Sequence, residues 1–312
     1  MTISSSRGAS RLRLYVPLAL ALLLLGGYTA LWFQGARVMR GEIDRWIAAE
    51  RAGGREVAHG TIRVRGYPGS LRGVVDAPRW AEPDAWSWQA ETLLVIAQPT
   101  RPRTLLLAPR GPQRVVRNGR TWDVEAADLR LALSRDSVAV QAEDLITSSG
   151  TERVTVGELR ANWTRNEDGS EVLGIAARDG AADFAGEPVI VPRLDAALAA
   201  NPGRRLALEA MQGALGTKEV TAPAELAAEG RVELTDDGYL EGRADLRLRG
   251  GGELIAVLTQ QGLIPPEHAD LAAGLIRNAE AQGRAVELPL SFRNAQVLVG
   301  PIPVAAQPRI GF

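Results

Sequence analysis

Side chains that could bind a metal or take part in catalysis are few, and none has a partner at a productive spacing. The chain of 312 residues contains two histidines, His59 and His268, and no cysteine. Protein zinc sites draw three or four ligands chiefly from His and Cys, so a zinc site is not expected. Glu267 and Asp270 lie beside His268 at an expected helix start, where acidic residues complement the helix dipole. The sequence therefore predicts no metal and no cofactor.

Motifs for a nucleophile or a bound phosphate are also missing. A Ser-His-Asp site would need one of the two histidines, and no Gly-x-Ser-x-Gly motif is present. The glycines at 250–252 precede an expected helix but lack the Lys-Ser/Thr of a P-loop. Acidic pairs such as Glu143-Asp144 fall at expected turns or strand ends, where carboxylates are usually solvated. We expect a protein that is not an enzyme. The net charge of -1 leaves no overall basic field, so nucleic acid is not expected as a partner.

The first apolar segment predicts a transmembrane anchor over residues 14–33. This run, from Leu14 to Phe33, contains no charged residue. At ~1.5 Å per residue it would span ~30 Å as a helix, which is the thickness of a bilayer's hydrocarbon core. Trp32 and Phe33 stand at its far end, where interfacial aromatic residues are expected. Three arginines in the preceding tail, residues 1–13, favour a cytoplasmic N-terminus by the positive-inside rule: Arg7, Arg11 and Arg13.

A cleavable signal peptide is the alternative to this anchor. Cleavage requires small residues at the last and third-last positions, and the candidate site ending Tyr28-Thr29-Ala30 places a bulky tyrosine at one of them. We therefore predict a single-pass protein of the bacterial inner membrane, with its C-terminal domain in the periplasm.

Residues 34–54 predict an amphipathic helix next to the membrane. Val38, Ile43, Trp46 and Ile47 share one face, and Gly53-Gly54 is a helix stop. The charged face could contact lipid headgroups. The interpretation we favour places the helix on the core of the outer domain, with its charged face in solvent.

From residue 55 to 312 the dominant pattern is alternation of apolar and polar residues, which is typical of strands with one buried face. Turn sequences such as Asn118-Gly119 and Asp237-Gly238 separate these strands and indicate antiparallel hairpins. The fold class is therefore mainly β (α+β), a large curved antiparallel sheet with a few covering helices. Helical insertions are expected at 192–200 and 252–283.

Prolines near the C-terminus predict breaks in the sheet. Pro289 cannot donate a ladder hydrogen bond, so its strand should be an edge or be paired there on one side only. The tail at 300–303, Gly-Pro-Ile-Pro, is expected to run extended outside a regular sheet.

Tryptophans gather in one short stretch, at Trp80, Trp86 and Trp88. They could form a stacking platform for a sugar or lipid. Packing in a core or interface is the more common role of such residues.

Three stretches together resemble a known family. They are residues 41–54, the turn Gly66-Tyr67-Pro68, and residues 288–304. The combination resembles an uncharacterised family of alphaproteobacterial membrane proteins, domain-of-unknown-function family 2125. That resemblance implies an envelope location and no reaction. The hairpin style around Leu246 is also similar to that of AsmA-like envelope proteins, for which lipid handling is commonly proposed.

Two functional hypotheses remain. The first is a binding module, in which the apolar face of the curved sheet holds a lipid or another hydrophobic envelope component. Its candidate ligand face consists of Leu129, Leu131, Leu240, Leu246, Leu248, Leu288 and Leu290. The second is a structural or interaction protein, whose helices close that face into a core and whose outer surface docks an envelope protein.

Overall fold

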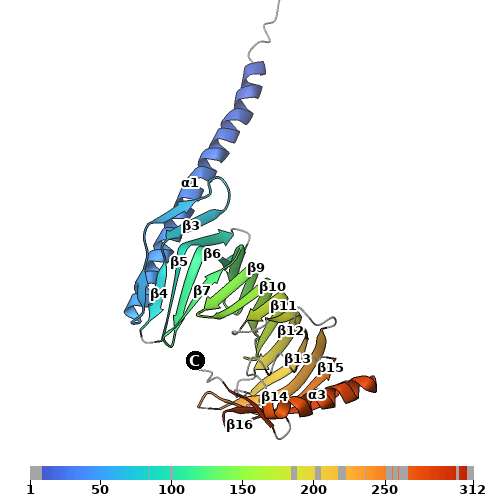
Figure 1. Ribbon diagram of the computed structural model, residues 1–312. Coiled ribbons are helices and arrows are strands. Elements are labelled where there is room, and N and C mark those ends of the chain that lie inside the picture. The colour runs from blue at the N-terminus through green and yellow to red at the C-terminus, as the bar shows by residue number, and fades with distance from the viewer. Residues whose placement is uncertain are drawn as a thin grey trace, which may run out of the picture.

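A computed structural model describes residues 9–83, 85–98, 101–183, 188–200, 205–216, 223–235, 237–250, 255, 259, 266–299 and 302–307. The described residues form one antiparallel sheet of eighteen strands, with a long helix at its N-terminal end (Figure 1). This confirms the predicted mainly β class. The helices with described bounds are α1 (Ala9–Ala52) and α3 (Pro266–Ala281). The strands are β1 (Glu56–Ala58), β2 (Ile62–Arg65), β3 (Leu71–Asp76), β4 (Arg79–Glu82), β5 (Trp86–Gln98), β6 (Arg101–Arg117), β7 (Arg120–Glu125), β8 (Asp128–Leu133), β9 (Ser137–Ser149), β10 (Glu152–Arg165), β11 (Glu171–Asp183), β12 (Val189–Ala200), β13 (Arg205–Gly216), β14 (Ala224–Leu234), β15 (Leu240–Arg249), β16 (Val286–Arg293), β17 (Gln296–Val299) and β18 (Ile302–Ala306).

The sheet is a meander. Near α1, β2 pairs with β3, β3 and β4 both pair with β5, and β1 pairs with β4. β6 then pairs with β7 and β8, and both of these pair with β9. From β9 to β18 each strand pairs with the next one along the chain. The strand direction turns progressively between β3 and β15, so the sheet is curved (Figure 1).

The anchor segment and the amphipathic segment form one continuous helix of 44 residues. Its apolar part is long enough to cross a membrane, and only 6% of its most apolar window is buried. The helix ends as Gly53-Gly54 predicted. Gly54 has a φ of 84°, and the Gly54 and Arg55 amides donate to the Arg51 and Glu50 carbonyls at 3.1 Å each. These two bonds are the Schellman pattern, which glycine favours because it adopts a left-handed φ without strain.

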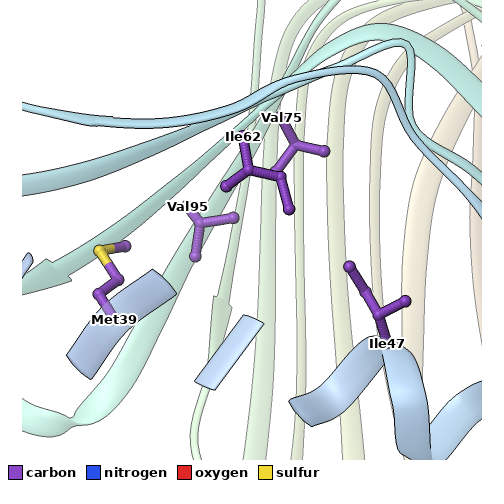
Figure 2. Close-up of a cluster of buried hydrophobic side chains, with 5 residues drawn as sticks. All are labelled: Met39, Ile47, Ile62, Val75 and Val95. Carbon is purple, nitrogen blue, oxygen red and sulfur yellow. The ribbon is translucent and has the colours of Figure 1, made fainter. Parts of the chain in front are cut away.

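The second half of α1 packs on the sheet and forms the main hydrophobic core there. Met39 and Ile47 are buried against Ile62, Val75 and Val95 of β2, β3 and β5 (Figure 2). This confirms the preferred interpretation of residues 34–54. Val38 and Trp46, which the sequence placed on the packed face, are instead about half exposed, at 55% and 49%.

The helical insertion predicted at 192–200 is wrong, because these residues belong to β12. The segment alternates as a strand, with Leu194, Ala196 and Leu198 on one face. Asp195 on the other face accepts a hydrogen bond of 2.8 Å from Arg178 of β11. Pairing with both β11 and β13 overrides the helical preference of its alanines.

The remaining predictions concern the helical insertion at 252–283, the strand that contains Pro289, and the tail at 300–303. α3 confirms the second helix of the 252–283 insertion, and most residues between 251 and 265 lie outside the described residues. Pro289 pairs with Asp245 of β15, while the pairing of β16 with β17 begins at Leu290, so the one-sided arrangement is confirmed. The expected irregular tail is wrong, since Ile302 and Pro303 pair with β17 as part of β18.

Candidate functional site

One apolar face runs without interruption across the sheet from β3 to β16. The strand register aligns a central row of apolar side chains and one glycine, with one residue from each of these strands except β4 and β7. This row consists of Gly73, Val95, Leu107, Leu131, Val140, Ala161, Ile175, Ala196, Met211, Ala228, Leu246 and Leu288. Because paired residues of adjacent strands point to the same side, the row lies on a single face of the sheet.

Two flanking rows have the same apolar character. The first contains Val75, Leu93, Pro109, Leu129, Ala142, Leu159, Ala177, Leu194, Gly213, Leu226, Leu248 and Val286. The second contains Leu71, Ala97, Leu105, Leu133, Val138, Trp163, Leu173, Leu198, Leu208, Gly230, Ala244 and Leu290. No charged or amide side chain occurs in the three rows, which together we call the apolar face.

Large and small residues alternate between strands in the middle of the apolar face. Along the central row from β9 to β14 the order is Val140, Ala161, Ile175, Ala196, Met211, Ala228. In the first flanking row the order is reversed: Ala142, Leu159, Ala177, Leu194, Gly213, Leu226. Each large side chain therefore has small neighbours on both adjacent strands and can cover them. Ala142 is 0% exposed, Ala228 is 5% exposed and Gly213 is buried. The other small residues, Ala161, Ala177 and Ala196, are partly buried, as are the large residues of these rows.

The helices cover only the ends of the apolar face. Within the described part of the chain, α1 packs against β1, β2 and β3, and α3 packs against β16. The middle strands β9 to β12 have no described helix over them (Figure 1). Seven strands at about 4.8 Å and three rows about 6.8 Å apart give roughly 700 Å² between β8 and β14. This is the area of sheet beneath the three rows, and most of the side chains over it are partly rather than fully exposed.

The opposite face of the same strands is polar and carries ion pairs. Arg178 and Arg193 both contact Asp195, at 2.8 and 3.4 Å, and Arg247 contacts Glu287 at 3.4 Å. These side chains are substantially solvent-exposed. The curved sheet therefore has one face suited to water and one suited to an apolar ligand.

The structure places six of the seven sequence-predicted ligand-face residues in the three rows of the apolar face. Leu131, Leu246 and Leu288 lie in the central row, and Leu129, Leu248 and Leu290 lie in the flanking rows. Leu240 lies further along β15, opposite Leu234 of β14. Sequence reasoning missed Ile175 and Met211, because the alanines and glycines around them dilute the alternation in β11 and β13. Their signal is visible only once strand register shows that the small residues lie beside large ones.

The tryptophan stretch serves packing. Trp80 lies edge-on to Trp86 and to Trp46 of α1, with ring centroids 4.7 and 6.0 Å apart. Its Nε1 donates to Glu50 Oε2 at 3.1 Å, which ties the end of α1 to β4. Trp88 is paired with Trp80 in the β4–β5 register, and its Nε1 donates to Gln113 Oε1 at 3.1 Å. This favours packing over a stacking platform.

The polar candidates do not assemble into a site. His59 Nδ1 lies 2.8 Å from the Gly60 carbonyl oxygen, and the side chain of His268 lies outside the described residues. No cluster of three metal-ligating side chains occurs among the described residues. A pocket of about 270 Å³ beside β1 is lined by Arg51 and Arg79, but Arg51 already donates twice to the Val57 carbonyl, at 3.0 and 2.7 Å.

Carboxyl groups with lowered pKa values are held by local hydrogen bonds. The pKa of Asp76, on the polar face of β3, is lowered chiefly by the Thr61 hydroxyl, with Arg63 adding a hydrogen bond and its charge. The pKa of Glu171 is lowered by hydrogen bonds from Arg165 and then Trp163. Both shifts favour the ionised carboxylate, which suits a structural ion pair.

Residues 32–308 match the model of a family described as an uncharacterized protein conserved in bacteria (DUF2125). No curated protein and no solved structure matches the chain. The resemblance to this family is thereby confirmed over nearly the whole chain, and the likeness to AsmA-like proteins is not supported by these comparisons.

Proposed function

The chain belongs to the DUF2125 family, whose description names no activity, and we propose that it is a membrane-anchored, non-enzymatic protein that binds lipid acyl chains. In this proposal α1 crosses the bacterial inner membrane with its N-terminus in the cytoplasm, and the sheet stands in the periplasm. The apolar face of the sheet holds the lipid.

The single observation that carries the proposal is the unbroken apolar face between β8 and β14, against which neither described helix packs. Apolar surface in water costs about 25 cal/mol per Å², so an exposed area of this size favours any apolar molecule that covers it. The strip is about 34 Å long across seven strands, whereas one bilayer leaflet is about 15 Å thick in its hydrocarbon part. One acyl chain, or two end to end, would fit along it.

The arrangement of the anchor supports a lipid as the occupant. The second half of α1 packs directly on β2, β3 and β5, so the near end of the apolar face begins beside the membrane-spanning helix. Membrane lipid is therefore the apolar molecule at highest local concentration. The absence of charge within the three rows suits acyl chains better than a polar ligand.

The test is photo-crosslinking with a phospholipid that carries a diazirine at the end of its acyl chain. The full chain is reconstituted in vesicles with this lipid, irradiated, and digested with trypsin. Cleavage at Arg165, Arg178 and Arg193 isolates most of β11 and β12 in separate peptides. We expect adducts on these peptides in addition to those on α1.

Adducts confined to α1 would contradict lipid binding by the sheet. If protein crosslinking of the same membranes then captured a protein on β11 or β12, the apolar face would belong to a protein interface. That result would favour the structural and interaction hypothesis.

A further inference from the structure

The loop between β2 and β3, residues 66–70, is hydrogen-bonded to the apolar part of α1. The Thr29 hydroxyl lies 2.8 Å from the Tyr67 hydroxyl, and Trp32 Nε1 donates to the Gly69 carbonyl at 3.2 Å. The Tyr28 hydroxyl donates to the Pro68 carbonyl. These contacts hold the loop at the level of the last turns of the apolar segment, below the start of the packed half of the helix.

An aromatic cluster surrounds this loop and stays open to its surroundings. The Tyr67 ring lies 5.5 Å from Trp32, 6.2 Å from Phe33 and 6.4 Å from Tyr28, measured between ring centroids. Tyr28, Phe33 and Tyr67 are nevertheless 45%, 53% and 44% exposed. Tyrosine and tryptophan have an apolar ring and a polar group, which is the chemistry of the membrane–water interface.

The position of the loop along α1 gives its depth. If the hydrocarbon span runs from Leu14 to Phe33, Thr29 lies four residues before its outer end. At ~1.5 Å per residue this is ~6 Å inside the level of Phe33. Interfacial segments commonly lie about 5–10 Å into the boundary between headgroups and acyl chains, and the loop falls in this range.

Arginines stand just outside this level. Arg65 and Arg72 lie opposite each other in the β2–β3 register, at the base of the loop. Arg37 and Arg40 follow Phe33 on α1. All four are exposed; the charge of Arg65 contributes to the lowered pKa of Asp76, and Arg72 Nε donates to Ser70 Oγ at 3.2 Å. Their height matches that of lipid phosphates, which attract arginine near a membrane surface.

We propose that residues 66–70 form a second membrane contact, inserted in the outer interface of the bilayer and held beside α1. The partner is the lipid headgroup region. This contact fixes the sheet upright on the membrane, so that the near end of the apolar face opens at the bilayer surface. The inference rests on the membrane anchor of the proposed function and is independent of lipid binding by the sheet.

The experiment uses depth-dependent fluorescence quenching in the full chain. Because the chain has no cysteine, one introduced thiol can carry the only nitrobenzoxadiazole label. Gly69→Cys places it in the loop, where a side chain atom would have the Gly66 carbonyl oxygen 3.3 Å away as its nearest neighbour. Leu24→Cys labels the centre of the apolar segment, and Arg135→Cys labels the exposed β8–β9 turn as the matched control. The vesicles contain phosphatidylcholine, phosphatidylglycerol and a nitroxide lipid, with the nitroxide either near the headgroup or near the acyl-chain end.

We expect the Gly69→Cys label to lose most of its fluorescence to the nitroxide near the headgroup and little to the deep one. The Leu24→Cys label should show the opposite preference, and the Arg135→Cys label should be insensitive to both. If Leu24→Cys is quenched while Gly69→Cys behaves like Arg135→Cys, the anchor stands and the second contact is refuted. If Leu24→Cys is not quenched either, both the anchor and this inference fail. Unchanged circular dichroism of each labelled variant shows that the sheet is intact.

Discussion

Replacement of Ile175 by glutamate separates an open apolar face from a closed core. Ile175 lies in the central row on β11, between Ala161 of β10 and Ala196 of β12, and is partly buried. Ala176→Glu is the matched control. It adds the same charge to the next residue of the same strand, on the polar face between Arg160 and Asp195.

The expected loss in the free energy of unfolding depends on how much of the Ile175 side chain is buried. Complete burial of an isoleucine contributes about 1.5–3 kcal/mol, so partial burial contributes about 1 kcal/mol. The weaker strand preference of glutamate adds up to about 1 kcal/mol. On an open face the carboxylate stays hydrated, and Ile175→Glu should lower the free energy of unfolding by about 1–2 kcal/mol. In a closed core an unpaired charge would cost above about 4 kcal/mol.

On an open face, Ile175→Glu should weaken lipid binding more clearly than it lowers the free energy of unfolding. An acyl chain on the central row would lose its contact with the isoleucine and would desolvate a carboxylate, which together exceed about 1.4 kcal/mol, or tenfold in affinity. The assay is the yield of diazirine-lipid adducts on β11 and β12, measured beside urea unfolding followed by tryptophan fluorescence. We expect Ile175→Glu to lose at least about tenfold in adduct yield while remaining folded, and Ala176→Glu to keep wild-type yield. A folded Ile175→Glu protein with undiminished adducts would refute the argument that this row holds the lipid.

Two further predictions concern the membrane-proximal end of the protein. Ile47→Ala removes a side chain that is 5% exposed in the core under α1, so urea unfolding should show the free energy of unfolding lowered by about 2–4 kcal/mol. Arg45→Ala, on the exposed side of the helix, should change it by less than about 0.5 kcal/mol. The lowered pKa of Asp76 means that the folded state favours its ionised form, so its stabilising contribution is present above the unfolded pKa of about 3.9 and is lost as the pH falls through the folded value. Asp76→Asn should therefore flatten the acid side of the stability–pH profile, and an unchanged slope below about pH 4 would contradict that assignment.

Alternation predicted the sheet well where large residues occupy every second position. Leu246 and Leu248 of β15 and Leu288 and Leu290 of β16 were assigned to one face from sequence, and the register places them together. Alternation fails in β12, where alanine fills both faces and the pattern no longer distinguishes a strand from a helix. Strand order and the alignment of rows depend on pairing between distant residues, which no local pattern carries.

The single helix α1 is a second case in which local reasoning was partly sufficient. Its apolar segment, its amphipathic segment and its stop at Gly53-Gly54 were all visible in the sequence. What the sequence could not show is the contact of the β2–β3 loop with Tyr28, Thr29 and Trp32, since it joins residues about forty positions apart. That contact determines how the sheet stands relative to the anchor.

The alternation of large and small residues explains how such a face can exist in water without a second layer over it. A sheet covered with leucine would expose every side chain and would associate with other copies. Here Ile175 lies between Ala161 and Ala196, and Leu159 lies between Ala142 and Ala177, so each large side chain stands beside small ones. Ala142 is fully buried and the other three alanines are partly buried. Neighbouring side chains of the sheet thus bury part of the apolar surface that a second layer of helices or strands would otherwise bury. The surface that remains exposed consists of the large side chains, and a flexible acyl chain can follow the shallow steps between them. A rigid protein partner would need a surface complementary to each of these differences in side-chain height. A flexible acyl chain therefore fits this face better.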